Sequence, residues 1–390
     1  MLGLAVSGGG DSLALLYLAA EAGLRVRVAT VNHGLRAEAA EEAAMVAGIC
    51  AQLGVPHETL AWSWDGTGNL QDAARRARIG LLADWAKGHG IGCVALGHTE
   101  DDVAETFLMR LARDAGVDGL SAMAARREIG GVVFLRPLLE ATRAELRRWL
   151  LDRGLPWIED PSNEDPRFDR VRARRAVQAM AEVGAGGAEI AALARRMAEM
   201  RAALEAVTAE AAARIARIDG GDVILETGGL AALPVEIRRR LLRAAVMWIG
   251  SAEYGPRGPE MERFIAAALA GRPATLAGCR SSHARGRMRL TRELRAVAAL
   301  EVPAGEIWDG RWRISGPDSK GLTLRALGEA GLTQCPDWRS AAVPRATLLA
   351  SPALWQGERL IAAPLAGFGG GWALRCAGPE GPLAAAPLSH

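Results

Sequence analysis

The feature that most constrains this chain lies at its beginning, where a short apolar run meets three consecutive glycines. Residues 4–6 read as a buried strand, residues 8–10 are glycines, and an apolar run with helical spacing follows from Leu13. Such a loop can turn several backbone N–H groups toward one point, because glycine has no side chain to block the approach. The helix N-terminus behind the loop adds a partial positive charge. The sequence therefore predicts an α/β domain with a phosphate-binding loop at residues 7–12.

The loop also contains an acid, Asp11, and it lacks the lysine of the G-x-x-x-x-G-K-[ST] pattern. A carboxylate beside a phosphate is repulsive unless a metal ion lies between them, so Asp11 indicates a Mg²⁺ ion on a pyrophosphate. Ser7 and Ser12 can donate hydroxyl hydrogen bonds. The alternative is an ordinary glycine turn in which Asp11 and Ser12 cap the helix.

The string SGGGDS resembles the PP-loop, S-G-G-x-D-S, of the ATP pyrophosphatases. These enzymes split ATP into AMP and pyrophosphate while they adenylate an oxygen of a second substrate. The resemblance implies the parallel-sheet fold of that superfamily, which is similar to the adenine nucleotide alpha hydrolases, with ATP as a substrate.

Polar residues also follow two later predicted strands. The strand at 25–31 is followed by His33, and the strand at 93–96 leads into a helix that carries Asp102 and Glu105. Because the carboxyl ends of parallel strands line one crevice, these side chains are placed to meet a ligand. The two carboxylates share a helix face and can hold a metal ion or an ammonium group. The alternatives are a turn histidine without a ligand and a capped helix with an acidic surface.

Two groups of arginines follow. Arg75 and Arg78 lie three residues apart on a predicted helix that starts at Asn69, and they share a face. Residues 167–175 contain five arginines and one acid, which suits the phosphates of ATP or of a nucleic acid. The alternatives are a solvated helix face for the first group and a charged linker between domains for the second.

Composition narrows the class of protein. The 390 residues are half hydrophobic, which allows two or three domains. The chain has no charge-free apolar run long enough to span a membrane, and no positive segment precedes the first apolar stretch. The five cysteines are far apart and form no CxxC pair, which indicates buried, reduced thiols in a cytoplasmic protein. The net charge of +2 does not by itself mark a nucleic-acid binder.

We expect three domains: a parallel-sheet domain at 1–180, a mainly helical domain with a hairpin at 181–298, and a small β-rich domain at 299–390. Within them we expect a turn at 113–120, a strand from Val132 that stops at Pro137, a helix capped by Thr142 and Glu145, helices at 186–218, 234–248 and 259–270, and a basic loop at 281–286 between hairpin strands at 275–280 and 287–290.

An ordered set of motifs resembles the tRNA(Ile)-lysidine synthases. The motifs are SGGGDS, VNHGLR, NLQDAARRAR, LGHTEDDVAET, RPLLEATRAEL and LPWIEDPSNEDPRFDR, and they cover roughly the first 175 residues densely. This family joins the amine of free L-lysine to C2 of the wobble cytidine in an isoleucine tRNA with a CAU anticodon. ATP first adenylates O2 of the cytidine, and the lysine amine then displaces AMP. The resemblance implies that activity and a tRNA-binding role for both later domains. It leaves open whether the protein forms a homodimer.

The resemblance also implies roles for individual residues, which we state as expectations. Asp102 and Glu105 hold the lysine substrate, and a nearby acid takes the proton that the amine must lose. Asp11 lies near Mg²⁺, and His33 and Arg36 lie beside the nucleotide. The ATP phosphates are expected to bind to the loop residues Ser7, Gly8, Gly9, Gly10, Asp11 and Ser12. Arg75 and Arg78 are expected to contact a phosphate or the adenylated base. ATP or the anticodon loop of the tRNA is expected to contact Arg170, Arg172 and Arg174.

The chain departs from the family pattern at three places. The loop begins at residue 7, where a longer leader is usual, so whether the true start lies upstream of Met1 stays open. Asn32 stands where an Asp is usual, and Val171 where the R-N-R pattern has Asn. Three other functions remain open: a PP-loop tRNA 2-thiolation enzyme, which often has paired cysteines; a non-catalytic tRNA-binding relative, which would have lost the acids; and a synthetase domain for a small molecule.

Overall fold

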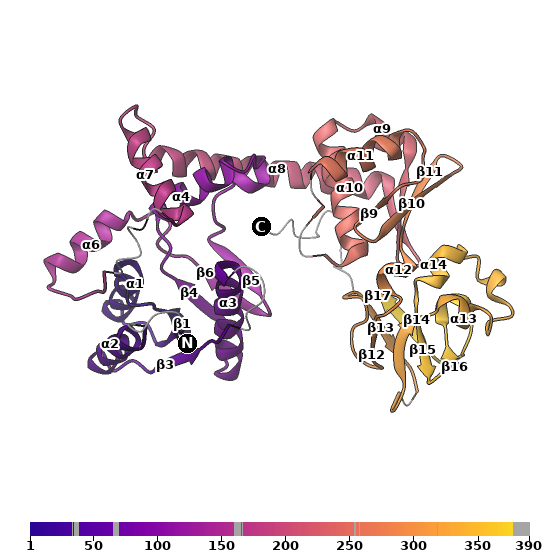
Figure 1. Cartoon of the computed structure of the whole chain (residues 1–390), viewed down its shortest axis with the longest axis horizontal. Coiled ribbons are helices and arrows are strands. Elements are labelled where there is room, and N and C mark those ends of the chain that lie inside the picture. The colour runs from indigo at the N-terminus through magenta and orange to yellow at the C-terminus, as the bar shows by residue number, and fades with distance from the viewer. Residues whose placement is uncertain are drawn as a thin grey trace. The chain divides into compact units, whose positions relative to one another are not determined.

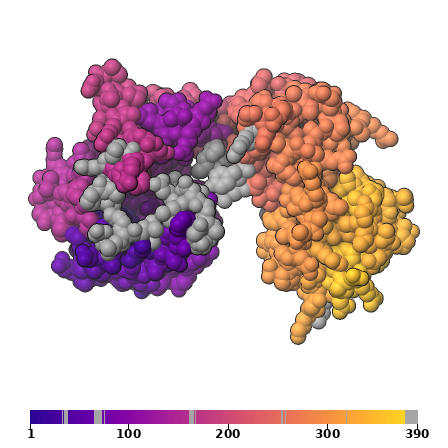
Figure 2. All heavy atoms as spheres, in the orientation of Figure 1, coloured from indigo at the N-terminus to yellow at the C-terminus, as the bar shows by residue number. Residues whose placement is uncertain are grey.

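The chain forms two compact units, Met1–Arg201 and Ala202–His390, whose border lies within helix α8 (Gly187–Ile215). Figure 1 shows the elements as ribbons, and Figure 2 shows the surfaces of both units, from indigo at the N-terminus to yellow at the C-terminus. None of the helices in the described ranges has the length and apolarity needed to cross a membrane. The computed structural model describes residues 1–32, 34, 39–64, 70–159, 165, 167–252, 255, 256, 258–317 and 319–376, with the backbone alone for 70–72 and 75.

Six strands form the central sheet of the first unit, in the order β3-β2-β1-β4-β6-β5. Neighbouring strands pair in parallel, except for the antiparallel pair of β5 and β6. The predicted parallel α/β fold of the N-terminal part is confirmed. The strands are β1 (Leu2–Ala5), β2 (Val26–Asn32), β3 (His57–Ala61), β4 (Cys93–Leu96), β5 (Arg126–Ile129) and β6 (Val132–Leu135).

Helices cover both faces of this sheet (Figure 1). Because side chains alternate along a strand, Leu4 of β1 faces α1, α2 and α6, whereas Ala5 faces α3. Leu16, Val46 and Leu150 complete the first layer and are fully buried. The helices are α1 (Gly10–Glu21), α2 (Ala39–Gln52), α3 (Leu70–Gly88), α4 (Glu100–Leu111), α5 (Val117–Leu120), α6 (Arg143–Asp152) and α7 (Asp169–Ala181).

The order of the strands determines where a ligand can enter. The chain leaves β1 toward β2 and β3 on one side, and it returns later as β4 on the other side. At such a point the loops that follow the two neighbouring strands turn apart and leave a crevice at the carboxyl edge of the sheet. Residues 7–12 follow β1 and residues 97–102 follow β4. Both predicted clusters therefore open into the same crevice.

The second unit contains two antiparallel sheets and a separate strand pair. The five-stranded sheet, β7-β8-β11-β10-β9, packs against α10 and α11, and the four-stranded sheet, β12-β14-β15-β16, packs against α13 and α14. The strands are β7 (Ala216–Asp219), β8 (Asp222–Glu226), β9 (Thr275–Leu276), β10 (Cys279–Ala284), β11 (Arg287–Arg292), β12 (Glu301–Pro303), β14 (Thr323–Ala326), β15 (Pro352–Gln356), β16 (Arg359–Ala362), and the pair β13 (Trp312–Ser315) with β17 (Ala373–Cys376). The helices are α9 (Thr227–Ala232), α10 (Val235–Gly250), α11 (Gly258–Leu269), α12 (Leu294–Val297), α13 (Gly328–Leu332) and α14 (Arg345–Leu349), with short 3-10 turns η2 (Trp338–Ala341) and η3 (Pro364–Ala366).

One buried carboxylate, on Asp222 of β8, links these two parts of the second unit. Its Oδ2 accepts hydrogen bonds from Arg289 Nη1 at 2.8 Å, Thr291 Oγ1 at 3.0 Å and Thr347 Oγ1 at 2.6 Å. Arg289 and Thr291 lie on β11, whereas Thr347 lies on α14. Burial raises the pKa of Asp222, and the bonds from Thr347 and Arg289 partly offset that effect.

Most of the predicted elements are present, and the β-rich C-terminal part is confirmed. The expected basic loop at 281–286 is wrong, because residues 281–284 belong to β10 and only Arg285 and Gly286 form the turn, both with positive φ. The helix expected to reach 218 ends at Ile215, since a Gly-Gly turn at 220 and 221 folds the following residues into a hairpin. Residues 117–120 form a short helix inside the expected turn, and β5 was not expected. The borders of the three predicted domains stay a prediction.

The cysteines agree with the expectation of reduced thiols. All five are free, and Cys50, Cys279 and Cys335 are buried. Burial raises the pKa of Cys50 to about 11 and that of Cys279 to about 12. Thiols with such pKa values are protonated at neutral pH and react slowly.

The first prediction concerns Asp222. Asp222→Ala leaves Arg289, Thr291 and Thr347 without their shared acceptor and should lower the free energy of unfolding by about 3 kcal/mol. Asp222→Asn keeps an oxygen at that point, so it should lose less than half as much. Urea unfolding of both variants and of Asp337→Ala, at an exposed position, measures the difference. Equal losses for the Asn and Ala variants would contradict this account.

Candidate active site

The glycine loop folds as a tight turn that only glycine permits at its centre. Gly8 has a φ of +94°, and a Cβ at that position would lie 2.6 Å from Cδ1 of Ile158. The backbone of Ile158 donates its N–H to the carbonyl of Gly8 at 2.9 Å. Helix α1 then begins at Gly10, so its first N–H groups lie at the predicted phosphate site.

The two loop serines mainly hold the loop itself together. The hydroxyl of Ser12 donates to the carbonyl of Gly9 at 2.9 Å and accepts from the N–H of Ser7 at 3.1 Å. Ser12 is buried, whereas Ser7 is exposed. The structure thus leaves the Ser7 side chain more accessible to an anion than that of Ser12, and ATP binding by both stays a prediction.

Asp11 has one carboxylate oxygen paired and one oxygen free of hydrogen bonds. Its Oδ2 accepts from Arg143 Nε at 3.2 Å, and its Oδ1 is buried without a donor among the described residues. Burial raises the pKa of Asp11, and Arg143 partly offsets the rise. A carboxylate oxygen without a donor fits Mg²⁺, which usually takes one or two carboxylates together with substrate phosphates.

The acid pair, by which we mean Asp102 and Glu105, lies in the first two turns of α4, directly after β4. The N–H of Thr99 donates to Asp102 Oδ2 at 2.9 Å, so Asp102 also caps its own helix. The side chains of Asp102 and Glu105 are 9% and 2% exposed. Burial to this degree requires partners, because an isolated buried carboxylate is very unfavourable. The alternative of an exposed acidic surface is wrong for both residues.

Three arginines supply the partners. Arg143, at the start of α6, bonds Glu105 Oε1 at 3.2 Å and Asp102 Oδ1 at 3.1 Å. Arg170 of α7 bonds Glu105 Oε2 and Asp102 Oδ1, both at 2.9 Å. Arg174, one turn later, bonds Glu105 Oε1 at 2.8 Å. We call these five residues, with Asp11 and Asp101, the acid–arginine cluster.

Most of the arginine-rich segment at 167–175 belongs to helix α7, and the helix places its arginines on different faces. Because residues four apart share a helix face, Arg170 and Arg174 both reach the acid pair. Arg172 lies between them on a different face and pairs with Asp169. The alternative of a charged linker is wrong for residues 169–181, which form α7.

Most of the loop and five residues of the cluster (Asp11, Asp102, Arg143, Arg170 and Arg174) line one cavity of about 500 Å³, whereas the predicted residues Gly8 and Glu105 do not line it. This volume lies within the range of pockets that bind small molecules and cofactors. Arg78 also lines the cavity, whereas His33 and Arg36 lie outside the described residues, as does the side chain of Arg75. The residues of the predicted site that line it are Ser7, Gly9, Gly10, Asp11, Ser12, Arg78, Asp102, Arg170 and Arg174.

Several residues that line this cavity were not predicted from the sequence, among them Arg143, Ile158 and Glu159, and the polar residues Thr30, Glu42, His98 and Arg147. Arg143 directly follows Thr142, whose predicted capping box is confirmed by bonds from Thr142 N to Glu145 Oε2 at 2.8 Å and from Glu145 N to Thr142 Oγ1 at 3.2 Å. The capping box marks the start of α6 and so places Arg143 in the first helical position. A cation there is unfavourable unless acidic side chains lie nearby, because the helix N-terminus carries a partial positive charge. This was the one local signal for Arg143.

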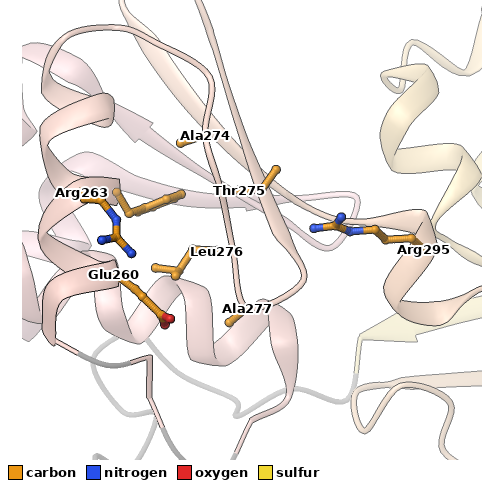
Figure 3. Close-up of a pocket in the computed structure, with 8 residues that line it drawn as sticks. Glu260, Arg263, Ala274, Thr275, Leu276, Ala277 and Arg295 are labelled. Carbon is orange, nitrogen blue, oxygen red and sulfur yellow. The ribbon is translucent and has the colours of Figure 1, made fainter.

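A second cavity, of about 370 Å³, lies in the second unit (Figure 3). Glu260 and Arg263 extend into it from α11, and Arg295 comes from α12. Thr275 and Leu276 of the edge strand β9 form the wall between them. None of the predicted site residues lines this cavity.

A family model described as the PP-loop domain matches residues 1–181. The chain is similar over its full length to a tRNA(Ile)-lysidine synthase of Ruegeria pomeroyi, with 52% identity across 94% of that protein. It is also similar to a tRNA(Ile)-lysidine synthase of Zymomonas mobilis, with 42% identity over 71% of this chain and 84% of that protein. Among solved structures, a U34-tRNA thiolase NcsA from Methanococcus maripaludis covers 51% of this chain and is itself covered to 71%, with 18% identity and a TM-score of 0.44.

The second prediction concerns the cluster itself. Glu105→Gln removes the charge that faces Arg143, Arg170 and Arg174 while it keeps the shape of the side chain. Since this removes the buried charge that the three arginines neutralise and leaves the largely buried Arg143 undercompensated, the free energy of unfolding should fall by about 3 kcal/mol. Chemical denaturation compares this variant with Glu182→Gln, at an exposed position at the end of α7, which should change stability little. A Glu105 variant as stable as the control would disprove the role of the ion pairs.

Proposed function

Because this chain belongs to the tRNA(Ile)-lysidine synthase family, we propose that it ligates free L-lysine to C2 of the wobble cytidine in an isoleucine tRNA with a CAU anticodon. The reaction passes through an O2-adenylated cytidine and releases AMP and pyrophosphate. One observation carries the proposal: residues of the glycine loop at 7–12 and Asp102 of the buried acid pair line the same cavity, and Glu105 lies beside Asp102 through their shared bonds to Arg143 and Arg170.

The loop side of the cavity suits ATP. Backbone N–H groups at the start of α1 and the exposed Ser7 hydroxyl would bind the phosphates. Asp11 would hold Mg²⁺ through its unpaired Oδ1, and the ion would supply charge neutralisation on the pyrophosphate. In the described part of the chain, no group of three metal-ligand side chains could hold an ion by itself. The metal would therefore share its ligands with the nucleotide, which is usual for Mg²⁺.

The acid side of the cavity suits an amine. Four carboxylates, those of Asp11, Asp101, Asp102 and Glu105, face the three guanidinium groups of the cluster. An ammonium group can replace a guanidinium group as the partner of such a carboxylate, and lysine supplies one. Arg170 has the most exposed side chain of the three arginines, at 47%, so an entering ammonium group would displace it most easily.

The amine must be neutral to attack C2 of the cytidine. A carboxylate of the pair that accepts the ammonium group can also take its proton, because it lies within hydrogen-bond distance. AMP then leaves with the former O2, and the new carbon–nitrogen bond replaces the carbon–oxygen bond. Arg78 and Arg75 are proposed to neutralise the phosphate of the adenylated base, as the resemblance implies.

The tRNA contacts are proposed on charge and position. Arg172 lies on the face of α7 that is turned away from the acid pair, and its side chain is 60% exposed. It would contact a tRNA phosphate from this exposed position beside its partner Asp169, whereas Arg170 and Arg174 would reach the anticodon loop at the mouth of the cavity. A homodimer and a cytoplasmic location stay predictions.

The decisive measurement is ATP-dependent incorporation of labelled L-lysine into a CAU-anticodon isoleucine tRNA transcript. The protein should incorporate lysine, and Asp102→Ala should reduce the rate by about 100-fold or more because it removes one of the two amine-binding carboxylates. Asp84→Ala, whose side chain is 81% exposed on α3, serves as the control and should retain the full rate.

Two other results of this measurement would support a different function. AMP formation without lysine attachment would keep the PP-loop reaction and overturn the lysine substrate. If the folded protein binds this tRNA and forms neither product, the non-catalytic tRNA-binding relative becomes the better account.

A further prediction tests tRNA binding by the second unit. Arg263 and Arg295 present two guanidinium groups at the cavity of Figure 3. Replacing both with Gln should weaken tRNA binding about tenfold and lower the slope of log affinity against log salt by about one for each phosphate that is no longer bound. Filter binding at several salt concentrations measures both quantities, with Arg313→Gln, on the exposed face of β13, as the control. An unchanged slope would remove this cavity from the tRNA-binding surface.

A further inference from the structure

Arg143 bonds the acid of the phosphate loop and both members of the acid pair at once. Its Nε donates to Asp11 Oδ2 at 3.2 Å, its Nη1 to Glu105 Oε1 at 3.2 Å, and its Nη2 to Asp102 Oδ1 at 3.1 Å. Each guanidinium nitrogen thus contacts a different carboxylate. Because the guanidinium group is planar and rigid, these three carboxylates are held at separations that the group itself defines.

The backbone of Arg143 is fixed as firmly as its side chain. Its N–H donates to Asp101 Oδ2 at 2.7 Å, and Thr142 before it forms the capping box with Glu145. The side chain is only 16% exposed. Burial alone would lower the pKa of Arg143, but Glu105, Asp102 and Asp11 hold it above the ordinary value, so the group stays charged throughout the reaction.

We propose that Arg143 is a positioning residue for the ligation: it sets the distance between the phosphate loop and the amine-binding acids, so that lysine rather than water captures the adenylated cytidine. This inference rests on the proposed function. Arg143 lines the cavity from the first residue of α6, between the two sets of groups that it connects.

The chemistry explains why separation matters. Attack by the lysine amine at C2 breaks the C2–O bond, releases AMP and leaves lysidine after loss of a proton. Attack by water on the same intermediate releases AMP and regenerates the cytidine, so one ATP is consumed without product. The ratio of the two outcomes depends on how closely the amine is held to C2, and misplacement of a reacting group by about 1 Å is worth about 100-fold in rate.

Loss of Arg143 should therefore uncouple ATP use from ligation. Asp11 Oδ1, which Arg143 does not contact, would still accept Mg²⁺, and the backbone N–H groups of the loop would still bind ATP, although more weakly because Arg143 no longer offsets the charge of Asp11. The acid pair, however, would no longer be tied to the loop and would hold the amine less accurately. Arg143→Lys keeps the positive charge but not the planar, rigid arrangement of donors that fixes the three carboxylates, so it should restore the coupling in part.

The experiment measures AMP and lysidine formed in the same reaction by wild type, Arg143→Gln and Arg143→Lys. Wild type should form one AMP for each lysidine, Arg143→Gln should raise that ratio at least about fivefold, and Arg143→Lys should lie between them. Arg148→Gln, at an exposed position on the same helix, is the matched control and should keep the wild-type ratio.

The ratio separates positioning from damage to the fold. A partly unfolded variant loses both products equally, so falling rates with an unchanged ratio in both Arg143 variants would overturn the inference. Unchanged rates would overturn it as well. If Arg143→Gln does not fold, the ratio of Arg143→Lys decides alone. Wild type that forms AMP without lysidine would overturn the proposed function, and this inference with it.

Discussion

The interaction on which the site depends is the mutual neutralisation of buried carboxylates and guanidinium groups at the carboxyl edge of the sheet. Glu105 is almost fully buried, and it accepts bonds from three arginines. A carboxylate at this depth is very unfavourable alone, and so is a buried guanidinium group. Each side of the cluster is therefore stable only because the other side is present, and the helices that carry them must pack together.

The fold brings these charges together from distant parts of the chain. The loop after β1 supplies Asp11, the helix after β4 supplies the acid pair, and α6 supplies Arg143. The first two lie at the point where the strand order reverses, and such a point opens a crevice in any parallel α/β sheet. Packing of α4 on α7 and α8 through Phe107 and Ile190 then sets Arg170 above the acids. The hydrophobic core thus determines where the charges meet.

The sequence predicted what local patterns encode. Alternation and helical spacing identified the parallel sheet, and the glycine run located the loop, because Gly8 needs a backbone conformation that other residues rarely adopt. Arg143 was missed because its bond to Asp11 joins residues 132 positions apart, and no local pattern reports such a contact. The separation of Arg172 from its neighbours follows from the helix period, but only once residues 169–181 are known to be helical.

The cluster also explains how one cavity can serve both adenylation and amine binding, which bring charges of opposite sign into the site. Adenylation gathers negative charge at the loop, while amine binding brings positive charge to the acid pair. A single arginine shared by Asp11 and the pair moderates both, since it lowers the repulsion between loop acid and phosphate and limits the excess negative charge beside the amine. If Asp11 of the loop and the acid pair had separate counterions, the side chains of each could rearrange independently when its own ligand bound. Sharing Arg143 makes a change in one half a change in the other, which is the physical basis for expecting ATP use and lysine transfer to remain coupled.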